Sequence, residues 1–352
     1  MHLRKSFKTK KRRELTIDQW RNKCEAVTLI SEKKDGTIKG RTCADGRAQR
    51  EHIKKEEAAS PTVSIESVML TSVIEAKERR HVVTGDIPNA FIQTYLKNED
   101  ERIIMVLRGK IAEIMEMNDP KIFSKYVEIE KGQKVLYLEC LNVIYGTLKA
   151  ALYFYRKFVS DIQEFGFKIN NYDRCTANKI VNGKQMTIVW HVDDFKASHA
   201  DAQELEILIN YLKDRYDDPE IGVMTVTRGK KHEFLGMLLD YSEPGKVKID
   251  MRDYVKKMLN EFEYDLLKRA ATPAGEWLFK INPEEVKVCD KMRQDFHTTT
   301  AKCLFLCKRG RPDIQTAVAY LTTKVREPDK DDWKNLLRLM TYLQKTQDLV
   351  LT

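Results

Sequence analysis

The segment from Met186 to Phe195 constrains the fold of this chain more than any other. An apolar, β-favouring run ends there in two adjacent carboxylates, Asp193 and Asp194. Upstream, Asn182-Gly183 separates this run from another β-favouring stretch, and Asn-Gly between two such runs is a strong hairpin signal. The sequence therefore predicts that one arm of a hairpin delivers both acids to a tight turn.

Two carboxylates at the end of a strand have two interpretations. Aspartate tolerates turn backbones and bonds to them locally, so the pair is compatible with a purely structural turn. The pair also offers the carboxylate oxygens that a divalent cation needs when it works on phosphates. Asp86 ends another predicted strand, His81–Asp86, and would meet the pair at one sheet edge if the two strands are neighbours. Three acids would then serve two cations, which nucleotidyl transfer holds roughly 3.5–4 Å apart.

The composition favours an anionic partner. The chain has 352 residues, which suggests two or three subdomains, and a hydrophobic fraction of 42% is enough for a core. The net charge of +9 favours nucleic acid as the partner, although a merely soluble, Lys-rich surface has the same composition. The seven cysteines are irregularly spaced without a CxxC motif, which indicates a reduced, intracellular chain. Cys303 and Cys307 are expected in the core.

The sequence does not predict a membrane partner or secretion. No apolar run approaches the ~18 residues of a membrane span. The basic N-terminus lacks the apolar stretch of a secretory signal. We interpret residues 1–24 as a basic tail, which is either a localisation or phosphate-binding tract or a frayed, solvated segment.

The pattern of elements predicts an α+β fold. Strands alternate with helices up to about residue 250, where a hairpin is expected with Phe234–Tyr241 and Val247–Ile249 as its arms around Pro244-Gly245. The remainder reads as mostly helical, with helices expected over 252–262, 312–325 and 333–344. Mixed strands and helices followed by a helical region are typical of this class.

Three blocks, in this order and spacing, resemble the reverse transcriptase of copia-type LTR retrotransposons. They are Gly85 to Phe91, Ile144 to Ala151 and His191 to Asp194, which the family writes roughly as DVKTAFL, LYGLKQAPR and YVDD. The Phe234–Gly236 and Arg311–Ile314 segments match later blocks of that family. Residues 41–49 and 57–61 fit its finger region, and the resemblance runs from about residue 25 to the end.

The resemblance implies a right-hand polymerase with fingers, a palm made of an antiparallel sheet plus helices, and a helical thumb or connection region. Fingers and palm would occupy residues 25–250, and the thumb or connection would occupy residues 251–352. The chain would be a fragment of a Pol polyprotein that ends before the RNase H domain. The integrase of that polyprotein would also lie outside this fragment. We expect it in the cytoplasm, within a virus-like particle, or in the nucleus.

The resemblance also implies roles for particular residues. Asp86 and Asp193 would be the principal ligands of two Mg²⁺ ions, for which Mn²⁺ is a possible substitute, and Asp194 would be the supporting carboxylate. Phe91 would be the gate that selects deoxyribose. The deoxynucleoside triphosphate would be contacted by Tyr145, Gly146, Arg41 and Arg47, with Lys39 as a further basic candidate. The RNA or DNA template-primer would be contacted by His191, Lys149 and Gly236.

Three positions depart from the family's pattern. His191 stands where the family has Tyr, and Asp45 stands where a Lys is usual. Lys149-Ala150-Ala151-Leu152 stands where the family has Gln-Ala-Pro-Arg, which removes a basic residue near the template. We expect altered efficiency from His191, because the metal ligands are unchanged. Two functions follow, an RNA-directed DNA polymerase or a catalytically inactive, nucleic-acid-binding remnant of a decayed element. A third possibility, a mispredicted gene without a stable fold, would show as the lack of a cooperative melt.

Overall fold

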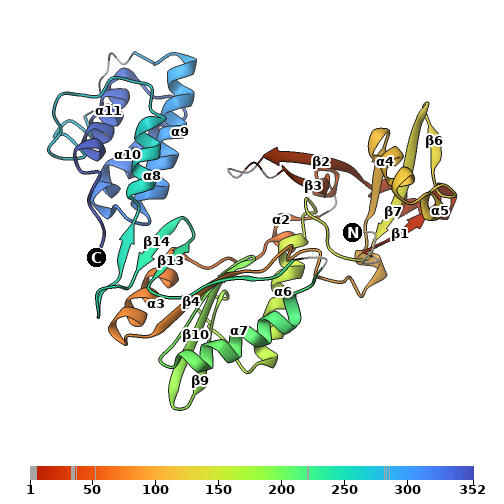
Figure 1. Ribbon diagram of the computed structural model, residues 1–352. Helices are drawn as coiled ribbons and strands as arrows, with labels where there is room; N and C mark the ends of the chain where they lie inside the picture. Colours follow the sequence, from red (N-terminus) through yellow and green to blue (C-terminus); the bar gives the residue numbers. More distant parts are fainter. Residues whose placement is uncertain are drawn as a thin grey trace.

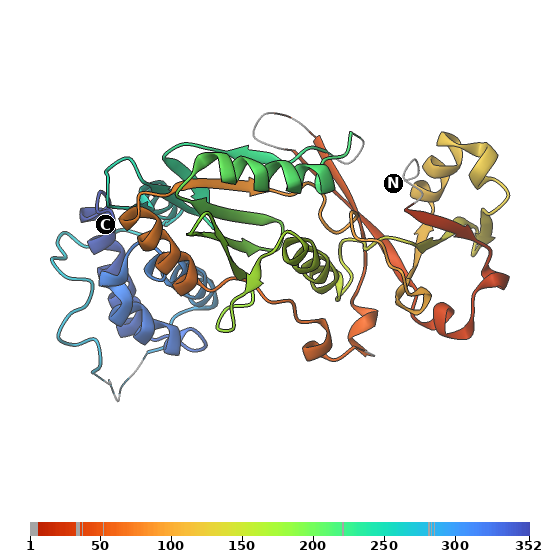
Figure 2. The same cartoon turned by 90° about the horizontal axis from the view of Figure 1, so that it is seen from below.

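The computed structural model describes residues 6–32, 36, 38–51, 53–219, 222–280, 282, 284 and 286–352. Within these residues the strands form three sheets, and helices pack around and after them, which confirms the predicted α+β class. Figures 1 and 2 show one sheet and its short helices at one end of the molecule, the C-terminal helices at the other end, and the central sheet between them.

The central sheet carries the residues of greatest interest. Its order is β12-β4-β11-β10-β9-β8. The predicted hairpin is confirmed, because β9 and β10 pair antiparallel around Asn182 and Gly183, whose φ angles are +50° and +75°. The strand bounds are β12 (Thr225–Thr227), β4 (His81–Asp86), β11 (Asp194–His199), β10 (Lys184–His191), β9 (Thr176–Val181) and β8 (Lys168–Ile169).

Alternation along β11 sends neighbouring side chains to opposite faces of this sheet. Phe195 pairs with Trp190, whose ring contacts Tyr155 and Phe158 of α6, so this face is covered by α6 (Ala150–Glu164) with α7 (Ala202–Tyr216) beside it. Lys196 points to the other face and contacts α3 (Ile65–Lys77). Ser64 caps α3 by accepting a hydrogen bond from the Ser67 amide, as the polar start of this segment predicts.

The N-terminal sheet corrects one prediction. Residues 7–10 are not part of a solvated tail, because they form β1, which pairs antiparallel with β7 over four residue pairs. Sheet pairing satisfies backbone groups that a frayed tail would leave to water. The order is β1 (Phe7–Lys10), β7 (Gln133–Cys140), β5 (Ile104–Arg108), β2 (Cys24–Glu32) and β3 (Ile38–Ala44), with β6 (Glu128–Glu130) also on β7. The short helices around it are α1 (Ile17–Arg21), α4 (Lys110–Asn118) and α5 (Pro120–Phe123), whereas α2 (Lys55–Ala58) follows β3 in the chain and precedes α3.

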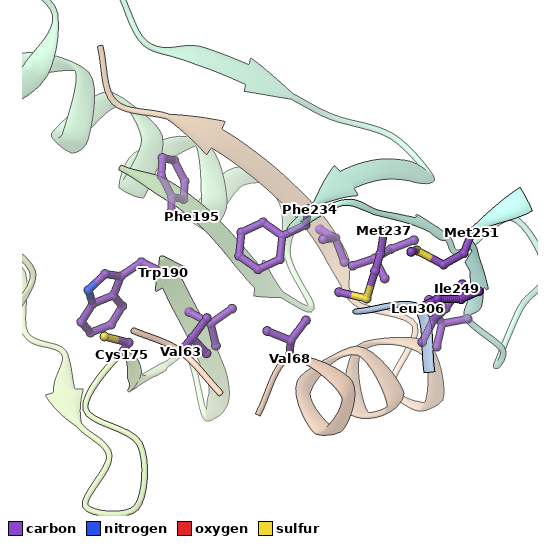
Figure 3. Close-up of a cluster of buried hydrophobic side chains, with 14 of the residues drawn as sticks. Val63, Val68, Cys175, Trp190, Phe195, Phe234, Met237, Ile249, Met251 and Leu306 are labelled. Atoms are coloured by element: carbon purple, nitrogen blue, oxygen red, sulfur yellow. The ribbon is translucent and has the colours of Figure 1, made fainter. Parts of the chain in front are cut away.

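The third sheet confirms the predicted hairpin, because β14 and β15 pair antiparallel, but the first predicted arm, residues 234–241, is not one continuous strand. Leu235 and Gly236 both have positive φ angles, +50° and +77°, and they form a tight turn that divides the segment into two strands. The sheet consists of β13 (Lys231–Phe234), β14 (Met237–Asp240) and β15 (Lys248–Asp250). Phe234 and Met237 point into the core shared with Val68 of α3 and Leu306 of α9 (Figure 3).

The C-terminal region is helical, as predicted, and includes one long helix that the sequence pattern did not delimit. That helix is α9, and Cys303 and Cys307 are both buried on it, which confirms their place in the core. The helices are α8 (Arg252–Asn260), α9 (Asp290–Cys307), α10 (Gln315–Lys324) and α11 (Lys330–Lys345). None of the helices in the described parts of the chain combines the length and apolar character that a membrane crossing requires.

Candidate active site

A rung of the central sheet brings two of the predicted acids together. β4 and β11 run antiparallel, and Asp86 at the end of β4 lies directly opposite Asp194 at the start of β11. Directly opposed residues project to the same face of a sheet, so both carboxylates share one side. Asp193 is held beside them because its carbonyl accepts a hydrogen bond of 3.0 Å from the amide of Ile87. The predicted adjacency of the two strands is confirmed.

The turn that presents Asp193 has an unusual backbone. His191 and Asp194 pair across it, and Val192 has a φ of +60°. A β-branched residue seldom adopts this conformation, which costs on the order of 1–3 kcal/mol. The ladders that flank the turn on both strands maintain this strain, so the position of Asp193 relative to the rung is fixed by the sheet rather than by a flexible loop.

The electrostatics of the rung favour a cation. The pKa of Asp194 is raised to about 6, first by burial of its carboxyl group, although much of the residue is exposed, and then by the charges of Asp193 and Asp86. His191 opposes this rise in pKa. The charges of Asp193 and Asp86 disfavour ionisation of Asp194, and a divalent ion would neutralise this local excess of negative charge.

We expect this excess to be visible in the stability of the metal-free protein. The folded-state pKa of Asp194, about 6, lies above the ordinary value of 3.8, so ionisation of this group destabilises the fold as pH rises through 4 to 6. Asp194→Asn should therefore raise the unfolding free energy at pH 8 by about 1 kcal/mol, after allowance for solvent screening, and leave it unchanged below pH 4. Thermal melts at both pH values, with and without millimolar Mg²⁺, measure this. An equal effect of the substitution at both pH values would contradict it.

Two aromatic rings and one guanidinium line up beside the carboxylates. The rings of Phe91 and Tyr145 are 4.7 Å apart, and the guanidinium carbon of Arg41 lies 5.3 Å from the centre of the Tyr145 ring. Burial raises the pKa of Tyr145, and the charge of Asp193 raises it further, so this ring is close to the acids. The structure thus joins three of the residues predicted to bind nucleotide to the predicted metal ligands.

Glycine is required where the second sequence block meets β3. The amide of Ala44 donates to the carbonyl of Tyr145 at 2.8 Å, and Gly146 follows with a φ of +92°. A Cβ on Gly146 would lie 2.2 Å from the carbonyl oxygen of Ala44, and a Cβ on Gly46 would lie 2.4 Å from that of Gly146. Only glycine permits these approaches. Gly146 therefore positions Tyr145, and the partner Gly46 was not singled out from the sequence.

The other predicted residues do not join this group. Arg47 is engaged in a bidentate ion pair with Asp45, and its side chain is 82% exposed. Lys149 lines a separate hollow of about 820 Å³, whose described lining does not include the three acids. Gly236 lies in the β13–β14 turn, where a Cβ would be 3.0 Å from the ring of Phe305. The side chain of Lys39 is outside the described residues.

The carboxylates do not form a closed metal cage. Among the described residues, no group of three or more His, Cys, Asp or Glu side chains converges as a ready metal site. Mg²⁺ is usually held by one or two carboxylates together with water and substrate phosphates, so its binding here would depend on those further ligands. The acids suit a cation because the charges of Asp193 and Asp86 raise the pKa of Asp194, and a bound cation would offset those charges.

Comparison with known proteins identifies the family of this chain. The family model described as reverse transcriptase (RNA-dependent DNA polymerase) matches residues 22–275. A protein of transposon Ty5-1 from Saccharomyces cerevisiae is 22% identical over 215 residues, which is 60% of this chain and 66% of that protein. The retrovirus-related Pol polyprotein from transposon TNT 1-94 of Nicotiana tabacum is 23% identical over 335 residues, which is 92% of this chain and 23% of the polyprotein.

Two solved structures are also similar. They are the foamy viral protease-reverse transcriptase with double-stranded DNA and with an RNA/DNA hybrid, each 12% identical, with TM-scores of 0.48 and 0.43. They cover 91% and 93% of this chain, and the chain spans 44% and 34% of those proteins. The family model matches well over half of the sequence, and both relatives are proteins of transposons. The chain belongs to the reverse transcriptase (RNA-dependent DNA polymerase) family of copia-type retrotransposons.

Proposed function

We propose that this chain is an RNA-directed DNA polymerase, which extends a primer on an RNA or DNA template as part of a retrotransposon Pol protein. The observation that carries the proposal is the rung of Asp86 and Asp194, with Asp193 beside it and the Tyr145 and Phe91 rings next to it. Family membership supports the same reaction. A structural Asp-Asp turn would have no need of the third acid or of the aromatic wall.

The residues divide the work as follows. Asp86 and Asp193 would hold two Mg²⁺ ions, or Mn²⁺, and Asp194 would support them. When bound, the two ions supply activation of the primer 3′ hydroxyl and stabilisation of the triphosphate and the leaving pyrophosphate. The strained turn at Val192 keeps Asp193 in place for this task. Tyr145 and Phe91 would lie along the sugar, and Arg41, an exposed guanidinium next to Tyr145, would contact the phosphates.

The proposed partners are a template-primer duplex, deoxynucleoside triphosphates and other Pol domains such as integrase and RNase H. The net charge of +9 supports a grip on the phosphate backbone that does not depend on base sequence. The relationship to a Pol polyprotein supports the association with other Pol domains. The imidazole of His191, beside the turn, and the ammonium of Lys149, at the start of α6, are proposed to contact the template-primer.

Primer extension on poly(rA)/oligo(dT) with Mg²⁺ tests the proposal. We expect incorporation of dTTP that requires the metal and is lost on its chelation. Binding of the duplex that weakens with salt, without any incorporation, would overturn the polymerase function and support the non-catalytic remnant instead.

The ring of Phe91 gives a prediction about sugar selection. Phe91 is half-buried against Tyr145, so Phe91→Val should open space for a 2′ hydroxyl. We expect the preference for dTTP over UTP to fall by about 10- to 100-fold, the range that steric changes of this size produce. Single-nucleotide incorporation rates for both substrates measure it.

Phe165→Val is the matched control. Phe165 is also half-buried, and its ring lies 4.5 Å from that of Tyr211, away from the carboxylates. An identical change in sugar preference for both variants would show that loosened packing, rather than a gate at Phe91, is responsible.

A further inference from the structure

A second rung of the central sheet lies directly beneath the acids. Thr84 of β4 and Lys196 of β11 are opposite one another, two residues from Asp86 and from Asp194 on their respective strands. Because alternate residues share a face, Thr84 and Lys196 project to the same side as the two carboxylates. Each of the two residues is almost fully buried, at 6% and 1% exposure. We call Thr84 and Lys196 the anchor rung.

The ammonium of Lys196 is held by a buried carboxylate of α3. Lys196 Nζ lies 2.5 and 2.6 Å from the two carboxylate oxygens of Glu75, and it also reaches the hydroxyls of Thr71 and Ser72. The side chains of Lys196 and Glu75 are 0% and 2% exposed. Two charges removed from water in this way are costly unless they are paired and fully hydrogen-bonded, as they are here.

Both residues of the anchor rung are tied to the β13–β14 hairpin. Tyr241, immediately after β14, donates its hydroxyl to Glu75 Oε2 at 2.6 Å and so joins the Lys196 cluster. His232 of β13 contacts the hydroxyl of Thr84 through Nδ1 at 3.3 Å. The hairpin is closed behind them because the Tyr241 amide donates to the carbonyl of Lys230 at 2.7 Å.

The far end of the same hairpin is the Leu235-Gly236 turn, in which Leu235 is half-buried and Gly236 is exposed. Its carbonyl at Leu235 accepts from Arg309 Nε at 3.1 Å, and Arg309 stacks on the Phe305 ring. Phe234 and Met237 on either side of the turn point into the core (Figure 3). The β13–β14 hairpin therefore has contacts at both ends: it is tied to the anchor rung at one end and to Arg309 at the turn, which is proposed to contact the primer.

We propose that Glu75 and Tyr241 are positioning residues, which fix the distance between the Leu235-Gly236 turn and the carboxylate rung. This rests on the proposed polymerase function, since the turn would place the primer end and the carboxylates would hold the reacting groups. Polar ties set one geometry, because hydrogen bonds are directional, whereas apolar packing of the same hairpin tolerates small shifts. A shift of about 1 Å at a reacting end is enough to slow chemistry by 10²-fold.

Tyr241→Phe tests the proposal with the smallest change. It removes the tie from the hairpin to Glu75 and leaves the Glu75–Lys196 pair intact. We expect the single-turnover rate of nucleotide addition to a pre-bound primer-template to fall about tenfold, with little change in duplex affinity. Tyr211→Phe is the matched control, because Tyr211 also donates a 2.6 Å hydrogen bond, to the Asp161 carbonyl, between α7 and α6. Its rate should stay unchanged.

The amplitude of the same experiment separates positioning from folding. The amplitude of the single-turnover reaction counts active molecules, so a loss of folded protein lowers the amplitude and leaves the rate unchanged. A lower amplitude with a wild-type rate in Tyr241→Phe would therefore overturn the proposal. The double variant Glu75→Leu/Lys196→Met replaces the ion pair by apolar groups of similar size and should fold. This double variant also lacks Glu75, the hydrogen-bond partner of Tyr241. The proposal therefore requires the same fall in rate as in Tyr241→Phe, and a wild-type rate in the double variant would refute it.

Hydrogen exchange gives a readout that does not need activity. Amides of residues 231–241 should exchange faster in Tyr241→Phe than in the wild type, while those of α6 and α7 should not. If the wild-type protein adds no nucleotide, the polymerase function fails, and exchange alone decides whether the hairpin is anchored. Unchanged exchange in residues 231–241 would overturn the anchoring itself.

Discussion

Asp193→Asn should abolish primer extension while leaving the fold intact. Asn keeps the size and shape of the side chain but removes the negative charge at the strained turn, and with it one principal contact to the proposed ions. A loss of about 4 kcal/mol of transition-state stabilisation corresponds to about a thousandfold lower rate. The rate of dTTP addition on poly(rA)/oligo(dT), measured at saturating duplex, gives the result directly.

The control for this substitution comes from a different pair of adjacent aspartates, Asp331-Asp332. Asp331 lies in the first turn of α11 and forms an exposed ion pair with Lys334, so Asp331→Asn should extend primers at the wild-type rate. The Asp193→Asn protein should bind duplex with unchanged salt dependence and melt at the same or a slightly higher temperature, because it loses a like charge near Asp194. Equal activities of wild type and Asp193→Asn would remove the catalytic interpretation of the whole rung.

Glu75→Leu should cause the largest loss of stability. The substitution leaves the ammonium of Lys196 buried without its carboxylate, and breaking a buried pair on one side costs about 3–5 kcal/mol. Most single domains have only about 5–15 kcal/mol in total, so this variant should be largely unfolded at moderate urea concentrations. Urea titration followed by far-ultraviolet circular dichroism gives the midpoint.

Two further variants make this result specific to the pair. Adding Lys196→Met to Glu75→Leu should restore most of the stability, because no charge is then left in the interior. Glu66→Leu, on the exposed side of the same helix, should change the unfolding free energy by less than about 1 kcal/mol. A single Glu75→Leu protein as stable as wild type would mean that Lys196 reaches water.

Local sequence patterns were sufficient for much of the central sheet. Asn182-Gly183 has positive φ angles at both positions, and the predicted hairpin follows from them. Ser64 caps α3 as a polar helix start should. These predictions succeed because turns and caps depend on residues within about four positions of one another.

The same reasoning found only part of the candidate site. Asp86, Asp193, Phe91 and Tyr145 were identified from ordered motifs, and the structure brings them together. Arg47 is predicted to contact the deoxynucleoside triphosphate, but Asp45, two residues earlier, forms an ion pair with it. Which cation remains available to a ligand depends on side-chain geometry, and a list of charges along the chain does not contain that geometry.

Lys196 marks the boundary between sequence and tertiary structure. The sequence by itself determined the hairpin arm that delivers Asp193 and Asp194 to a turn, and it places Lys196 two residues after that turn. Only the fold decided that α3 covers this face of the sheet and that Glu75, 121 residues earlier, meets the ammonium at 2.5 Å. The fold likewise placed β1 beside β7 and β4 beside β11. Alternation tells which residues share a face, but burial and pairing depend on what packs there, and that is set by the whole chain.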